Sequence, residues 1–242
     1  MSGAYRNGVE PPGASRSFPA SSGRPGLTPR PRWSHKPGRF PPSLRGTYLR
    51  RRPPSPLLLD RLDTLALKAT FFVVGCYAAE HPDIVRETLR RGHDIGTHLY
   101  HHRRETVRDL PLFEQELRRS CEVLESALGE PVRWLRYPYG NRGLTHPRTI
   151  QASFGLRTVH WTFSSHDSIS PEPARIVRRV SAGLRPGVII LMHDRLADAD
   201  GALPDRYVTN RSATIAALGP IADLLGERGV RAVTLTELLD GR

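Results

Sequence analysis

The sequence is poor in several residue types, and each shortage excludes a class of protein. Its two cysteines, Cys76 and Cys121, exclude a disulfide scaffold and a four-cysteine zinc site. They are compatible with either one disulfide or two thiols. No apolar run approaches the roughly 18 residues of a membrane-spanning helix, so we expect no span. Two lysines stand against thirty-four arginines, which indicates GC-rich DNA. The 242 residues suffice for one sizeable domain.

Acidic residues are almost missing from the N-terminal quarter of the chain. Residues 1–56 hold eleven Lys and Arg but one acid, Glu10, whereas residues 57–242 hold twenty-five basic and twenty-three acidic residues. The formal net charge of +12 therefore belongs mainly to the N-terminal segment. Residues 57–242 have the composition of an ordinary, nearly neutral domain.

The same segment contains twelve prolines and seven glycines and shows no apolar period. Such a stretch buries too little surface to offset its chain entropy, so we expect residues 1–56 to be disordered. It contains no apolar h-region of the usual roughly 7–15 residues, and we expect no secretory signal in it. Two interpretations stay open: a basic tail that touches polyanions nonspecifically, and a solvated tail without a specific role.

From Pro56 onward, short apolar stretches alternate with helical patterns. We expect strands over residues 69–75, 93–96, 132–135, 156–161, 188–192 and 231–235. We expect helices over residues 56–62, 81–91, 110–128, 171–184 and 212–228. This alternation predicts a parallel sheet, and the number of repeats suggests an α/β barrel. In such folds the chemistry lies where strands end at their C-terminal side.

Polar side chains follow four of these expected strands. Asp167 comes after residues 156–161, and the side chains after the other three each have an ordinary interpretation. His98 and His102 resemble a surface histidine cluster, Arg136 a turn arginine, and His193 a capping or core histidine. Histidines four apart can also bind one metal ion if their loop turns like a helix, and neutral imidazole suits zinc. His193 has the chemistry of a general acid. Chance does not readily place all of them at strand ends.

Together these motifs resemble the polysaccharide deacetylases, carbohydrate esterase family 4, also called the NodB homology domain. The resemblance runs from about Pro56 to Leu239. Lys68–Gly75 matches the family's second strand, and the stretch from His98 to His102 is similar to its metal motif, with Leu99 in place of Ser or Thr. Arg136–Gly140 matches the R-x-P-[YF]-G motif. The segments Trp161–Asp167 and Leu191–Asp194 are similar to the two remaining ones, with Ser164 where Asp is usual.

The resemblance implies a distorted (β/α) barrel and a metal-dependent removal of acetyl groups from a polysaccharide such as peptidoglycan, chitin or acetyl-xylan. Carried over, His98 and His102 are metal ligands, with zinc as the default ion. His193 is the general acid, tuned by Asp167. Arg136 positions the base, and the backbone N–H of Tyr139 helps to hold the oxyanion. We expect a monomer that binds no specific nucleic acid. Relatives usually work outside the cytoplasm.

The family's first motif, T-F-D-D-G-P, is not where the resemblance requires it. Its two Asp supply the base and the third metal ligand, yet no Asp precedes Asp60. Allowed codons for Arg45 to Pro53, read one base later, encode Val-Ala-Leu-Thr-Phe-Asp-Asp-Gly and the start of Pro. We therefore hypothesise a frameshift between about Pro53 and Leu57, which would leave the first strand missing or disrupted. The alternative is that the present sequence is real and that its basic segment is a polyanion-binding arm.

Three functions follow from these observations. The first is a deacetylase, impaired in the present sequence because the paired Asp are absent. The second is a catalytically inactive protein that keeps a carbohydrate-binding cleft. The third is a polyanion or nucleic-acid binder that acts through residues 1–56.

Overall fold

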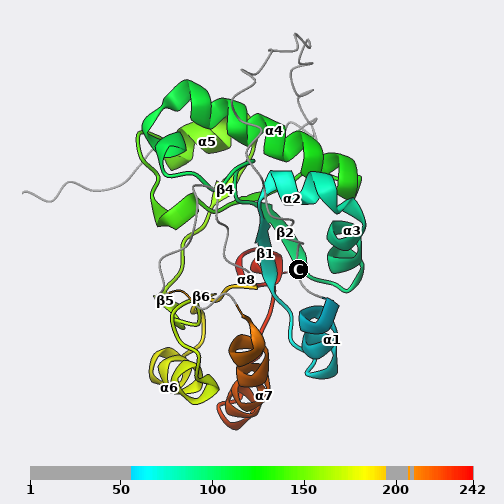
Figure 1. Ribbon diagram of the computed structural model, residues 1–242, viewed down its shortest axis with the longest axis vertical. Helices are drawn as coiled ribbons and strands as arrows, with labels where there is room; N and C mark the ends of the chain where they lie inside the picture. The colour runs from blue at the N-terminus through cyan, green and yellow to red at the C-terminus, as the bar shows by residue number, and fades with distance from the viewer. Residues whose placement is uncertain (1–55, 195–206, 208–209, 242) are drawn as a thin grey trace, which may run out of the picture. The chain divides into compact units, whose positions relative to one another are not determined.

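The computed structural model describes residues 56–194, Tyr207 and residues 210–241 (Figure 1). The basic segment before Pro56 lies outside them, so the expectation of disorder there remains a prediction. The described helices are α1 (Pro56–Thr64), α2 (Gly75–Glu80), α3 (Pro82–Arg90), α4 (Leu110–Leu128), α5 (Pro147–Phe154), α6 (Pro173–Gly183), α7 (Ser212–Glu227) and α8 (Leu235–Asp240). The 3₁₀ turns are η2 (Glu105–Arg108) and η3 (Pro138–Gly140). The strands are β1 (Thr70–Val73), β2 (Asp94–Thr97), β3 (Trp134–Leu135), β4 (Arg157–Thr158), β5 (Phe163–Ser164) and β6 (Ile190–Leu191).

All described strand pairs are parallel, which confirms the α/β class. One ladder has the order β1-β2-β3-β4, and a second joins β5 to β6. Only residues 159–162 separate β4 from β5, so one continuous segment pairs with β3 through its first part and with β6 through its second. The pairing therefore runs from β1 round to β6 in the manner of an open barrel.

The helix expected over residues 56–62 is present as α1, which extends to Thr64. Two local expectations differ from the structure. Helices α2 and α5 were not expected. Residues 231–235 do not form a strand, because no described strand pairs with them through a ladder of hydrogen bonds. Within the described part of the chain, the only ladder-like bond of this stretch runs from the Lys68 N–H to the Ala232 carbonyl, at 3.4 Å.

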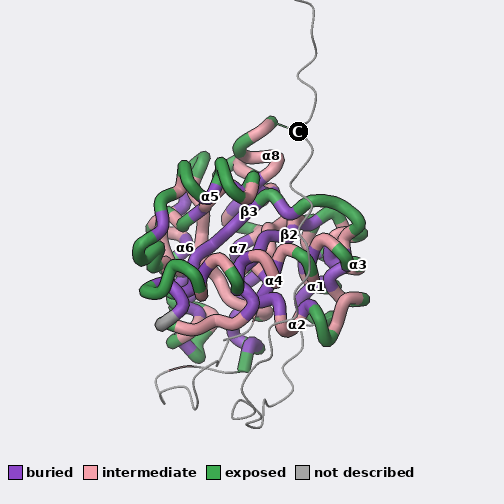
Figure 2. Tube along the Cα trace, turned by 90° about the horizontal axis from the view of Figure 1, so that it is seen from above, coloured by how far each residue is buried: buried purple, intermediate pink, exposed green. Residues whose placement is uncertain are grey.

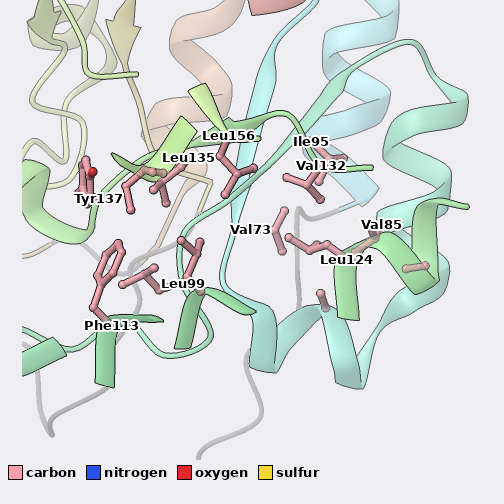
Figure 3. Packing of buried hydrophobic residues seen from close by; sticks show 14 of the residues in the cluster. Val73, Val85, Ile95, Leu99, Phe113, Leu124, Val132, Leu135, Tyr137 and Leu156 are labelled. Atoms are coloured by element: carbon pink, nitrogen blue, oxygen red, sulfur yellow. The ribbon is translucent and has the colours of Figure 1, made fainter. Parts of the chain in front are cut away.

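Helices cover the strands on both sides. Figure 1 shows α4 and α5 along one side of the strands and α6 and α7 along the other. The cluster in Figure 3 packs β1–β3 against α2, α3 and α4, with Val73, Leu99, Phe113, Leu124 and Leu135 buried. A second cluster joins α1, α6 and α7 to the outer face of β6. In Figure 2 the labelled strands β2 and β3 are mostly buried, whereas β1, β4, β5 and β6 are mostly of intermediate exposure.

Two negative findings complete the fold. Within the described ranges, no helix combines the length and apolarity that a bilayer crossing requires. Cys76 and Cys121 form no disulfide, so of the two alternatives the structure has two thiols. Burial raises the pKa of the Cys76 thiol to about 11, which keeps it protonated and unreactive.

Gly96 gives a test of the packing between β1 and β3. A Cβ at Gly96 would lie 2.7 Å from the Phe72 ring and 2.9 Å from the Trp134 carbonyl. We predict that Gly96→Ala lowers the free energy of unfolding by about 1–3 kcal/mol, because the site has no room for a methyl group. Urea unfolding measures the change.

The matched control is Gly226→Ala in α7, where a Cβ meets nothing within 4 Å. This variant is expected to gain up to about 1 kcal/mol through reduced freedom of the unfolded chain. Equal stability of the two variants would contradict the packing described for β2.

Candidate active site

The candidate metal histidines come from the loop after β2. His98 follows Thr97 directly, and its N–H donates to the Val73 carbonyl at 2.9 Å. Its Nδ1 lies 2.6 Å from the Arg136 carbonyl oxygen. A carbonyl only accepts, so Nδ1 carries the proton and the Nε2 lone pair is free. Burial, followed by the neighbouring His102, lowers the pKa of His98 well below its ordinary value and keeps the ring neutral.

His102 lies beside His98, with ring centroids 4.8 Å apart and planes at 54°. The loop does not turn like a helix, since Leu99 has φ +64°. Burial lowers the pKa of His102 to about 4. Its Nδ1 is buried and has no hydrogen-bond partner among the described residues. A neutral imidazole with an unpartnered buried nitrogen is suited to binding a cation.

The two histidines alone do not complete a metal site. In the described part of the chain, no three His, Cys, Asp or Glu side chains are placed to share one ion. Catalytic zinc sites ordinarily have three protein ligands. The residues present therefore fit a metal through two imidazoles, and the third ligand that the resemblance implies is not among the described residues.

His193 and Asp167 form a buried hydrogen-bonded couple. Nδ1 of His193 donates to Asp167 Oδ1 at 2.9 Å, and the His193 backbone N–H donates to Oδ2 at 2.8 Å. The His193 side chain stays partly exposed at 27%, so its Nε2 is the end free to meet a substrate. The pair has the arrangement of a general acid oriented by a carboxylate.

Three further residues hold Asp167. Ser165 Oγ donates to Oδ1 at 3.1 Å, and the other two, Thr214 and Arg211, were missed by sequence reasoning. Thr214 Oγ1 donates to Asp167 Oδ2 at 3.1 Å, and Arg211 lies 3.6 Å from the same oxygen. Burial alone would raise the pKa of Asp167, but the hydrogen bonds from His193 and the charge of Arg211 lower it on balance. No local signal marks Thr214 or Arg211, because both come from the start of α7, far along the chain.

Arg136 follows β3 and reaches across the end of β4. Its Nη2 donates to the His160 carbonyl at 2.9 Å and its Nε to the Val159 carbonyl at 3.3 Å. The guanidinium also lies over the Phe72 ring, 4.1 Å from its centroid. Burial lowers the pKa of Arg136 to about 10. No carboxylate of the described residues forms an ion pair with it.

Tyr139 lies at the rim of the same site in a left-handed conformation, with φ +57°. Its ring is 4.4 Å from the His102 ring, and it is 41% exposed. A cavity of about 940 Å³ brings together five of the six predicted site residues, His98, His102, Arg136, Tyr139 and His193, with Asp167 buried behind His193. His101, in contrast, points away: its Nδ1 pairs with Glu116 at 2.8 Å, a structural role.

Comparison with known proteins identifies the family. A family model described as "Polysaccharide deacetylase" matches residues 52–159. A chitooligosaccharide deacetylase of Sinorhizobium fredii is 33% identical over 186 residues, which cover 72% of this chain and 80% of that protein. This chain belongs to the polysaccharide deacetylase family. The predicted family and its barrel-like fold are thereby confirmed.

Solved structures of the family agree. A family 4 carbohydrate esterase from Streptomyces lividans, in complex with acetate, has a TM-score of 0.62 and 30% identity, covering 75% of this chain and 87% of that one. A family 4 pseudoenzyme from Bacillus anthracis has a TM-score of 0.63 and 28% identity. That alignment covers 76% of this chain and 60% of the pseudoenzyme. A mutant of that pseudoenzyme is described as having restored enzymatic activity. The deacetylase fold therefore occurs with and without activity.

The Asp167–His193 couple predicts a pH-dependent stability. The folded-state pKa of Asp167 is lowered, so its contribution is complete above the unfolded value near 4 and is lost as the pH falls below it. We predict that Asp167→Asn costs about 1.5–3 kcal/mol at pH 6 and less at pH 3. Urea unfolding at both pH values measures this.

Asp109→Asn serves as the control. Asp109 caps α4 by accepting from the Leu112 N–H at 3.0 Å, and Asn caps helices about as well as Asp. Its stability should stay near that of the unchanged chain at both pH values. A cost for Asp167→Asn that grows toward pH 3 would show that the buried carboxylate is protonated in the folded state.

Proposed function

We propose that the chain is a metal-dependent deacetylase of N-acetylglucosamine-containing polysaccharide whose present sequence lacks part of the catalytic machinery. The observation that carries this proposal is the neutral His98–His102 pair, with one buried nitrogen unpartnered, facing one cavity with the Asp167–His193 couple. The substrate class follows that of the Sinorhizobium relative, a chitooligosaccharide deacetylase. The amide bond between the acetyl group and the sugar nitrogen would lie between the histidine pair and His193.

Each residue of the site would carry out one part of the reaction. A divalent ion, with zinc the default, would be held by His98 and His102 and would supply activated water when bound. His193 Nε2 would deliver a proton to the leaving nitrogen. Asp167 holds the opposite nitrogen and favours the charged imidazole. Arg136 contributes positive charge that is fixed by two carbonyls, the geometry needed to orient an acidic base.

The described residues lack that base. Of the residues that line the cavity, Asp194 is the one acid, and it follows His193 in the segment after β6 rather than facing the histidine pair from another strand. The frameshift hypothesis accounts for this shortage, because the other reading frame supplies two Asp just before α1. The restored activity of the Bacillus anthracis mutant supports the view that this fold can be returned to catalysis.

A second candidate is a catalytically inactive carbohydrate binder. The cavity opens beside the exposed Tyr139 and the partly exposed Trp161, and aromatic faces are common supports for sugar rings. Binding of chitooligosaccharide without acetate release, by both the present and the frame-restored chain, would favour this function over the first.

The decisive experiment compares the present chain with a frame-restored chain, in which residues 45–53 read Val-Ala-Leu-Thr-Phe-Asp-Asp-Gly-Pro. We predict no zinc-dependent acetate release by the present chain and clear release by the restored one. Zinc affinity should rise by more than about 100-fold. Losing a residue that only orients a metal ligand already lowers the affinity by roughly 10–100-fold, and losing the ligand itself lowers it further. Acetate release and zinc competition with a chelating dye measure the two effects.

Two variants of the restored chain sharpen the result. His102→Ala should abolish both gains, whereas His146→Asn, at the exposed cap of α5, should leave both unchanged. Turnover by the present chain that a chelator abolishes would contradict the proposal. Equal zinc affinity of the present and restored chains would contradict the assignment of the missing ligand.

A further inference from the structure

Helix α6 carries positive charge with no acid of its own to balance it. Within its bounds it contains Arg175, Arg178 and Arg179 and neither Asp nor Glu. Among the other described α-helices, α5 has one arginine and no acid, and each of the rest contains at least one acidic residue. Because residues 57–242 as a whole are nearly neutral, the surplus on α6 is local and does not follow from the arginine-rich composition alone.

The three arginines lie on the outer side of α6. Ile176 and Val180 are fully buried and pack in the cluster that joins α6 to α1 and α7, whereas the three arginines are exposed. At 3.6 residues per turn, the three arginines fall within an arc of about 100° around the helix axis. Figure 1 shows α6 beside α7, the helix on which its apolar side packs. We call the surface formed by the three arginines the α6 basic face.

No described carboxylate neutralises the α6 basic face. Arg179 Nε donates to the Ser164 carbonyl at 3.4 Å, and its Nη2 lies 3.4 Å from His166 Nε2. In the part of the chain that the structure describes, none of the three arginines forms an ion pair, whereas arginines elsewhere pair with acids such as Glu87 and Asp240. The guanidinium groups of this face therefore have donors available for an anion from outside the chain.

Two further arginines extend the basic surface past the C-terminal end of α6. Arg228 donates through Nη1 to the Leu184 carbonyl at 2.9 Å and through Nη2 to Ser181 Oγ at 3.1 Å. Arg185 is exposed just beyond the last turn. Neither forms an ion pair with a carboxylate of the described ranges. Positive charge therefore follows the whole helix, which is about 16 Å long at 1.5 Å per residue.

The shape and composition of this surface discriminate between classes of polyanion. A line of charge along one helix fits a linear polymer, and a guanidinium group binds phosphate through two parallel N–H···O bonds. A helix that docks on a membrane adds large apolar side chains, and a surface for single-stranded nucleic acid adds aromatic rings on which bases stack. None of the large hydrophobic side chains exposed among the described residues belongs to α6. The surface therefore favours a phosphodiester backbone that is recognised by its charge.

We propose that the α6 basic face binds a linear phosphodiester polymer and that Arg185 and Arg228 extend the contact. This surface adjoins the candidate active site, because Arg179 contacts Ser164, which lines the cavity. A bound polymer therefore lies beside the segment that carries Asp167. The proposal goes beyond the deacetylase function and does not depend on it.

The experiment measures how the full chain binds a fluorescently labelled abasic phosphodiester oligomer, a probe that has the charged backbone and no bases. Fluorescence anisotropy gives the affinity over a range of salt concentrations. The combined variant Arg175→Gln, Arg178→Gln, Arg179→Gln should lower the slope of log affinity against log salt by about 2, because each phosphate contact of a single strand contributes about 0.7. At about 0.1 M salt this variant should bind about 100-fold more weakly.

The matched control replaces three other exposed arginines, Arg86, Arg108 and Arg148, by Gln. They come from α3, η2 and α5, and none forms an ion pair with a described carboxylate. This control removes the same charge from scattered positions and should leave the slope nearly unchanged. Lysine at the three α6 positions keeps the charge and should keep the slope. Residues 1–56 are present in every variant, so their contribution cancels in the comparison.

Three results would overturn the proposal. An equal loss of slope in both Gln variants would show that binding follows net charge, and an unchanged slope in the α6 variant would assign binding to residues outside α6. Binding to phosphatidylglycerol vesicles that requires the three arginines, without binding to the oligomer, would assign the surface to a membrane. If the combined variant does not fold, Arg178→Gln alone should lower the slope by about 0.7, and no change there would count against the proposal equally.

Discussion

Parallel strand pairing is the constraint on which the rest of this structure depends. Each pair of neighbouring strands runs in one direction, so the loops that follow them meet at one end. His98 after β2, Arg136 after β3 and His193 after β6 reach one cavity for this reason. Residues almost a hundred positions apart thus line one cavity, and each requires only a short strand before it.

Burial then determines the chemical state of these residues. The loss of water disfavours charge on His98 and His102, lowers the pKa of both and keeps both imidazoles neutral. The same loss of water would disfavour charge on Asp167, yet four donors from Ser165, His193 and Thr214 hold it ionised. One end of the barrel therefore contains neutral imidazoles close to a stabilised carboxylate, and the difference comes from hydrogen bonds.

Each strand of a parallel barrel packs best between two neighbours. In the part of the chain that the structure describes, β1 pairs with β2 alone and β6 with β5 alone. The apolar faces of α1 and α7 pack on one another and on β6, and they cover this side of the sheet. The same fold is found in a pseudoenzyme of Bacillus anthracis.

The sequence by itself determined the family, the parallel α/β class, most helices and the residues that meet in the cavity. These features depend on local patterns: apolar strands, Pro82 at the start of α3, and short motifs at strand ends. Only the tertiary structure decided that Arg211 and Thr214 hold Asp167 and that the His101 side chain pairs with Glu116. It also decided that residues 231–235 form no strand. Each of these outcomes depends on a partner distant in sequence, which no local pattern encodes.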